Sequence, residues 1–92
     1  MNKERRKAIS DLKNKLDTLK GGELESINNG IEEVKDAEQE AFDNMSENFQ
    51  QGERGQAMEG AIEALDRAYQ AIEQAMDSLI EAYDALDEAE NV

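Results

Sequence analysis

The sequence predicts an all-α protein: a long antiparallel helical hairpin with coiled-coil and alanine-rich heptads, which pairs with a second copy into a four-helix bundle. The 92 residues include no proline and no tryptophan, with two Phe and two Tyr, a composition typical of helices. Large apolar residues recur every three or four positions, the spacing of one helix face. Five heptads follow one another without interruption over residues 57–91. The whole chain is expected to form one domain.

The first helix is expected from about residue 2 to residue 44. Gly21 and Gly22 favour a break, because a glycine in a helix interior costs about 1 kcal/mol, and Lys20 followed by glycine also resembles a helix C-cap. The apolar residues on the two sides nevertheless share one face at 100° per residue, which favours a continuous helix with a weak joint at 21–22. These residues are Ile9, Leu12, Leu16 and Leu19, then Leu24, Ile27, Ile31, Val34, Ala41, Phe42 and Met45.

The periodicity lapses over residues 45–55, where a corner between helices is expected. Ser46 is a candidate N-cap for a short turn, and Gly52 and Gly55 provide the backbone freedom that a reversal needs. Arg54 is expected to bridge to Asp43 or Glu38. The side chains expected to close this end of the core are Phe42, Met45 and Phe49.

The second helix is expected from about residue 56 to residue 90. A seven-residue apolar repeat of this length predicts a left-handed supercoil. Its seam consists of Ile62, Tyr69, Met76 and Tyr83 at position a, and of Met58, Leu65, Ile72, Leu79 and Leu86 at position d. Alanines fill most of positions g and c beside this seam. Since two helices rarely bury enough apolar surface alone, the alanine flanks predict a homodimer.

Charge is distributed unevenly. Twenty-three acidic residues against ten basic ones give a net charge of −13, yet residues 1–20 carry seven bases and three acids, net +4. In an antiparallel hairpin this basic start would lie beside the acidic residues of 77–90 and complement them; the alternative is an arm for nucleic acid or an anionic membrane, for which base-reading and aromatic residues are missing. Residues 21–76, with fourteen acids and three bases, keep an unbalanced charge of −11.

The residue types exclude most catalytic chemistry. Without His or Cys there is no thiolate or Ser-His nucleophile and no zinc cluster, and there is no glycine-rich phosphate loop. We therefore expect no enzyme activity, no cofactor and no metal. No apolar run is long enough for a membrane span, the acidity disfavours direct nucleic-acid binding, and a cytoplasmic location is expected.

The stretch Glu33–Ala68, which contains EAFDNM and then ERGQ, resembles a family of short acidic proteins encoded by bacteriophages, prophages and mobile elements. Ser46 stands where that family would have proline. The resemblance implies a phage or mobile-element origin, hence the host cytoplasm, and a helical hairpin; it implies no activity. The matching residues are Glu38, Phe42, Asp43, Asn44, Arg54, Gly55 and Gln56.

Two functions remain after these exclusions. The first is stoichiometric binding to a protein with a basic surface, such as a nucleic-acid-binding host protein, by a DNA-like acidic surface; with the phage resemblance this suggests an anti-defence inhibitor of a restriction or CRISPR nuclease. The second is a structural coiled-coil module that assembles with itself. The candidate binding residues are Glu32, Glu33, Asp36, Glu40, Asp43, Glu47, Glu53, Glu59, Glu63 and Asp66.

Overall fold

The computed structural model describes all residues 1–92 and is all-α, as predicted. Its elements are α1 (Lys3–Leu19), the π-helical turn η1 (Lys20–Leu24), α2 (Glu25–Asp43), α3 (Glu47–Gln50) and α4 (Glu53–Glu90). Residues 3–43 are thus helical without interruption, which confirms the prediction of one continuous first helix. The second helix begins at Glu53, three residues before the predicted start at 56.

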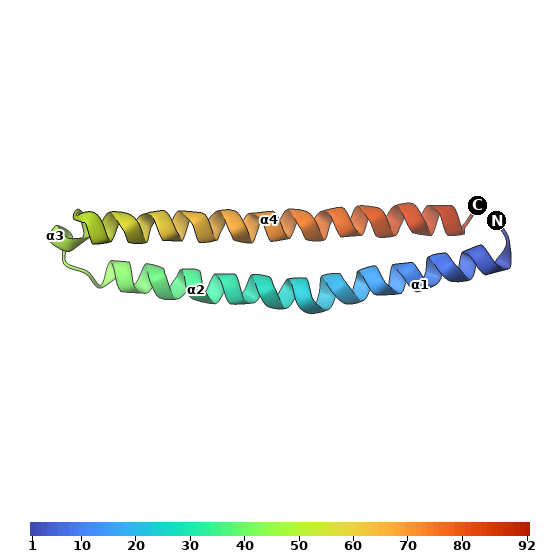
Figure 1. Cartoon of the computed structure of the whole chain (residues 1–92), viewed down its shortest axis with the longest axis horizontal. Helices are drawn as coiled ribbons and strands as arrows, with labels where there is room; N and C mark the ends of the chain where they lie inside the picture. The colour runs from blue at the N-terminus through green and yellow to red at the C-terminus, as the bar shows by residue number, and fades with distance from the viewer. The chain divides into compact units, whose positions relative to one another are not determined.

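Contacts group the chain into two units, each of which is an antiparallel arrangement of helices. Unit 1 comprises residues 1–26 and 73–92, and unit 2 comprises residues 27–72. In unit 1, α1 runs beside the C-terminal part of α4 (Figure 1), and the amino group of Met1 donates a hydrogen bond to the carbonyl oxygen of Val92 at 3.1 Å. This unit is therefore built from the two ends of the chain.

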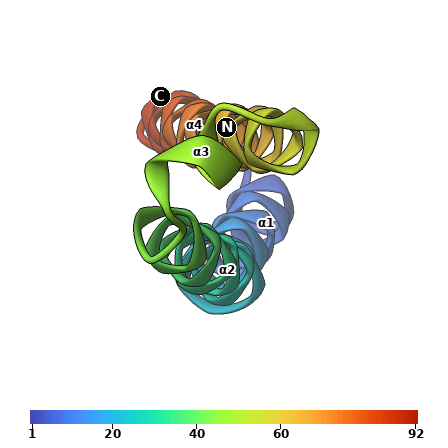
Figure 2. The ribbon, with the colours of Figure 1, turned by 90° about the vertical axis from the view of Figure 1, so that its left-hand side faces the viewer.

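In unit 2 the chain reverses through the single turn α3, which crosses between the end of α2 and the start of α4 (Figure 2). The side chain of Gln50 donates a hydrogen bond to the carbonyl oxygen of Phe42 at 2.9 Å and ties α3 to α2. Gly55 is buried, and a Cβ atom there would overlap the carbonyl group of Gln50. Ser46 occupies the predicted N-cap position, but its side chain makes no capping hydrogen bond.

The weak joint predicted at Gly21-Gly22 is the π-turn η1 rather than a break. In α1, η1 and α2, the at least half-buried residues that face α4 lie seven positions apart up to Lys20 and again within α2. From Lys20 to Asn28, across η1, the interval is eight positions. A π-turn holds one residue more than an α-turn, so an interval of eight residues across η1 takes the place of an interval of seven in an α-helix. This row comprises Lys13, Lys20, Asn28, Lys35 and Phe42, all of which are at least half-buried.

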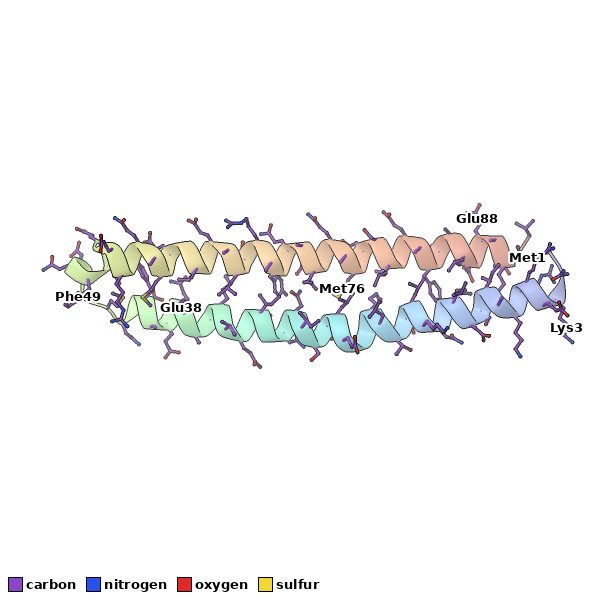
Figure 3. The ribbon with its side chains drawn as sticks, in the orientation of Figure 1. Met1, Lys3, Glu38, Phe49, Met76 and Glu88 are labelled. Carbon is purple, nitrogen blue, oxygen red and sulfur yellow. The ribbon has the colours of Figure 1, made fainter.

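The a and d residues of α4 form the seam, as predicted: all nine are half-buried. Met76, for example, points toward the facing helix of unit 1 (Figure 3). However, no apolar side chain is fully buried anywhere in the chain. The predicted apolar stripe of the first helix also divides in two. Ile9, Leu16, Leu24 and Ile31 face α4, whereas Leu12, Leu19, Ile27 and Val34 are exposed.

The outcome for the alanines differs between the two flanks of α4. Four of the five g alanines are half-buried beside the seam, while every c position, namely Ala57, Ala64, Ala71, Ser78 and Ala85, is exposed. Ala68 and Ala75 therefore already pack within the chain. Of the two flanks, only the c positions leave a continuous row of small residues open to solvent.

Candidate protein-binding surface

The ten acidic residues singled out in the sequence all lie in unit 2, on three helices. Five are on α2, one is on α3 and four are on α4. Nine of them are exposed, and only Asp66 is half-buried. Unit 2 holds eleven acidic residues against three basic ones, net −8. The structure thus gathers these carboxylates in one unit and leaves them accessible.

Asp66 is the one candidate that forms an ion pair. The ammonium group of Lys35 lies 2.7 Å from Asp66 Oδ1, and the Gln70 amide donates to Asp66 Oδ2 at 2.9 Å. The hydrogen bond to Asp66 raises the pKa of Lys35 above its ordinary value. Asp43 accepts a hydrogen bond from the Gln39 amide at 3.0 Å. Lys35 makes the only ion pair of unit 2, so the negative charge of this unit is left largely uncompensated.

The basic start of the chain has a different environment. Lys13 lies 2.6 Å from Asp87 Oδ1 and 3.1 Å from Glu90 Oε2, and its ammonium group stands 5.0 Å from the centre of the Tyr83 ring. The hydrogen bond to Asp87, and then that to Glu90, raises the pKa of Lys13 above its ordinary value. For Lys13, these contacts confirm the predicted complementarity between the basic start and residues 77–90, whereas the other six bases of residues 1–20 form no ion pair. The contacts assign Lys13 to a role within unit 1.

The corner residues are only partly placed as expected. Phe42 and Met45 are half-buried, but Phe49 is 68% exposed and does not close the end of a core. The reason is local: α3 is a single turn at the end of unit 2 where the chain reverses, so the helices cover little of its aromatic side chain (Figure 3). Arg54 forms no ion pair, so the predicted bridge to Asp43 or Glu38 is absent. Arg54 and Phe49 instead line a shallow hollow with Ala41, Met45 and Met58.

Asn28 is a feature that sequence reasoning missed. It is 4% exposed, and its side-chain oxygen Oδ1 has no hydrogen-bond partner. A buried amide oxygen without a partner costs about 1–3 kcal/mol. The signal that could have found it is its position eight residues after Lys20 and seven before Lys35, in the row that faces α4.

No group of three or more acidic side chains is arranged to hold a metal ion. Every helix is too short or too polar to cross a membrane. The chain matches no protein-family model, no curated protein and no solved structure.

Proposed function

We propose that this protein acts by stoichiometric binding to another protein, through the acidic surface of unit 2 and without catalysis. The observation that supports this most strongly is the exposure of nine of the ten candidate carboxylates, in a unit with a single ion pair. A surface with uncompensated charge of one sign attracts partners of the other sign and speeds their association. The partner is a protein with a basic surface.

The spacing of the carboxylates suggests which basic surfaces would fit. Glu32, Asp36 and Glu40 lie four residues apart on α2, and neighbours at this spacing are about 5–6 Å apart on a helix. This approximates the separation of phosphates along a nucleic-acid strand, so a groove that binds nucleic acid is the natural target. With the resemblance of residues 33–68 to phage and mobile-element proteins, we propose an anti-defence inhibitor of a restriction or CRISPR nuclease in the host cytoplasm.

Charge reversal tests this proposal. Glu32, Asp36 and Glu40 are replaced together by Lys, and the matched control is Glu73, Asp77 and Glu81 to Lys, which has the same spacing on the exposed face of α4 in unit 1. Both proteins are used to capture partners from a host lysate, with circular dichroism to verify helicity. The proposal expects only the first variant to lose its partner, and capture by the native protein to fall steeply with salt. Equal capture by both variants would refute it.

Self-association into a four-helix bundle is a second proposal, supported by a different observation. The chain has no fully buried apolar side chain and leaves several large ones exposed, so a second copy is expected to complete the core. A structural module that assembles in this way is the alternative function. Sedimentation equilibrium tests the assembly: apolar association should persist at high salt, and a stable 10.3 kDa monomer would refute it.

A further inference from the structure

The corner of unit 2 exposes an aromatic side chain beside a hollow. Phe49 is the most exposed large apolar residue of this unit, at 68%, and lies at the end where the chain reverses (Figure 3). The hollow measures about 320 Å³, and four of its five lining residues are apolar, namely Ala41, Met45, Phe49 and Met58, with Arg54 as the fifth. This volume is at the lower end of the range of about 300–1,000 Å³ for ligand pockets and suits a single large side chain.

The lining residues are of the kinds that bind apolar side chains of other proteins. Met45 and Met58 are half-buried, and a methionine side chain adapts its shape to what it contacts because it is unbranched and flexible. Phe49 adds a rigid aromatic surface, and buried aromatic side chains dominate the energetics of many protein interfaces. The hollow is therefore suited to an apolar side chain.

The corner holds Phe49 in place without a partner. The backbone N–H of Gln50 donates to the carbonyl oxygen of Ser46 at 3.0 Å, and the Gln50 side chain donates to that of Phe42 at 2.9 Å. Gly55 allows α4 to begin directly against the carbonyl group of Gln50, where a Cβ atom would overlap. A surface that is already held in one arrangement loses less conformational entropy on binding.

The sequence positions around the hollow are acidic. Residues 40–59 include five acids and one base, net −4. All five acids are exposed, and each is within two positions of a lining residue: Glu40, Asp43, Glu47, Glu53 and Glu59. The one base, Arg54, forms no ion pair. An apolar side chain flanked by lysines or arginines therefore complements the corner in chemistry and in charge.

We propose that the corner of unit 2 binds a basic amphipathic segment of the partner protein, with a leucine of that segment in the hollow against Phe49. The inference rests on the proposed function and adds an apolar anchor to its acidic surface. Surface charge mainly speeds association, whereas a buried apolar contact mainly slows dissociation. Arg54 is the one like charge at the corner, so Arg54→Gln should tighten binding of a basic segment several-fold.

Two synthetic peptides labelled with fluorescein test the anchor. Both are amphipathic helices with the same lysines, and the apolar face consists of leucines in one and of alanines in the other. Fluorescence anisotropy should give the leucine peptide a dissociation constant about ten-fold lower for the native protein. Phe49→Ser should abolish this preference. Val34→Ser is the matched control, because it removes another exposed apolar side chain from the same unit, and it should retain the preference.

Tryptophan fluorescence locates the contact, because the chain has no tryptophan of its own. Unlabelled peptides are added to the Phe49→Trp and Val34→Trp proteins. The emission of the Phe49→Trp protein should shift to shorter wavelength with the leucine peptide and not with the alanine peptide, since only the leucine peptide removes water from the indole ring. The Val34→Trp protein should shift with neither.

The outcomes separate the anchor from the charge-based binding. Equal affinities of the two peptides for the native protein would overturn the inference; if the combined replacement of Glu32, Asp36 and Glu40 by Lys weakens both peptides, the proposed function stands. A leucine preference that survives Phe49→Ser, or an unchanged emission of the Phe49→Trp protein, would also overturn the inference. If neither peptide binds the native protein at low salt, the proposed function fails with it.

Discussion

The ammonium group of Lys13 lies 2.6 Å from the carboxylate of Asp87, although 74 positions separate them in the sequence. The Lys13 side chain is only 13% exposed, and it contacts Glu90 and Tyr83 as well. One cation thus holds three side chains of α4, and it fixes the register between α1 and α4 in unit 1. Isolated exposed ion pairs contribute little to stability, but a shared and partly buried cation contributes more.

Replacement of Lys13 by Met should lower the thermal midpoint by several degrees. The substitution keeps the length of the side chain and removes the ammonium group that Asp87 and Glu90 bind. The measurement is thermal unfolding followed by circular dichroism, with Lys7→Met as control, because Lys7 is exposed and forms no ion pair. Equal midpoints for the two variants would show that Lys13 does not fix the register.

The raised pKa of Lys13 predicts how this stabilisation depends on pH. A lysine whose pKa is higher in the folded state stabilises the fold fully below the unfolded pKa of about 10.4, and the effect is lost as pH rises beyond it toward the folded value. The difference in midpoint between the native protein and Lys13→Met should therefore be constant through neutral pH and decrease above about pH 10.4. A difference that already decreases between neutral pH and pH 9 would contradict this assignment.

Two glycines should respond to alanine in opposite directions. Gly60 faces open space on α4, so Gly60→Ala should increase the free energy of unfolding by about 1 kcal/mol, the difference in helix propensity. At Gly55, the added Cβ would overlap the carbonyl group of Gln50, so Gly55→Ala should destabilise the protein. Urea unfolding of both variants tests the corner geometry, which is wrong if Gly55→Ala is neutral.

Deletion of Gly22 should be tolerated and should stabilise the first helix. The deletion removes the one residue by which the π-turn η1 exceeds an α-turn. The interval between Lys20 and Asn28 then becomes seven residues, like the interval between Lys13 and Lys20. It also removes a glycine penalty of about 1 kcal/mol. Deletion of Gly30 is the control, because it rotates the rest of α2 by about 100° and moves its half-buried residues away from α4. Urea unfolding should show a gain for the first deletion and a loss for the second.

Replacement of Asn28 by Leu should stabilise the protein. The side-chain oxygen of Asn28 has no partner although the residue is 4% exposed, so removal of the amide recovers about 1–3 kcal/mol. Asn29→Leu, at an exposed neighbouring position, is the control. Size-exclusion chromatography would show whether the Leu variant also forms mixed assemblies, since a buried asparagine in a helix seam restricts register and oligomeric state. A destabilised variant would mean that the amide has an essential partner.

The seam of α4 could be predicted completely, because a strict heptad repeat places the large apolar residues on a single helix face. Ile62 and Tyr69 at position a, for example, are both half-buried as expected. The first helix could be predicted in extent but not in rotation. Its apolar stripe is wider than one neighbouring helix can cover, and periodicity alone does not decide whether Leu16 or Leu19 faces α4. The prediction that Phe49 is buried was wrong for a related reason. Its hydrophobicity suggests burial, but the direction of a one-turn helix depends on the segments that it connects.

The acidic residues were predicted to form one region, and unit 2 gathers them, because α2 and the start of α4 are joined through α3. Sequence reasoning could not predict that Lys35 would choose Asp66 among so many carboxylates. That choice depends on side-chain directions across two helices, which only the three-dimensional arrangement gives.

The composition of the two units has a consequence for synthesis on the ribosome. Unit 2 is one continuous segment, residues 27–72, whereas unit 1 needs residues 1–26 together with residues 73–92. Chains fold progressively from the N-terminus as they emerge. The acidic unit can therefore form first, while α1 must wait, with its apolar side chains uncovered, until the last helical turns of α4 are made.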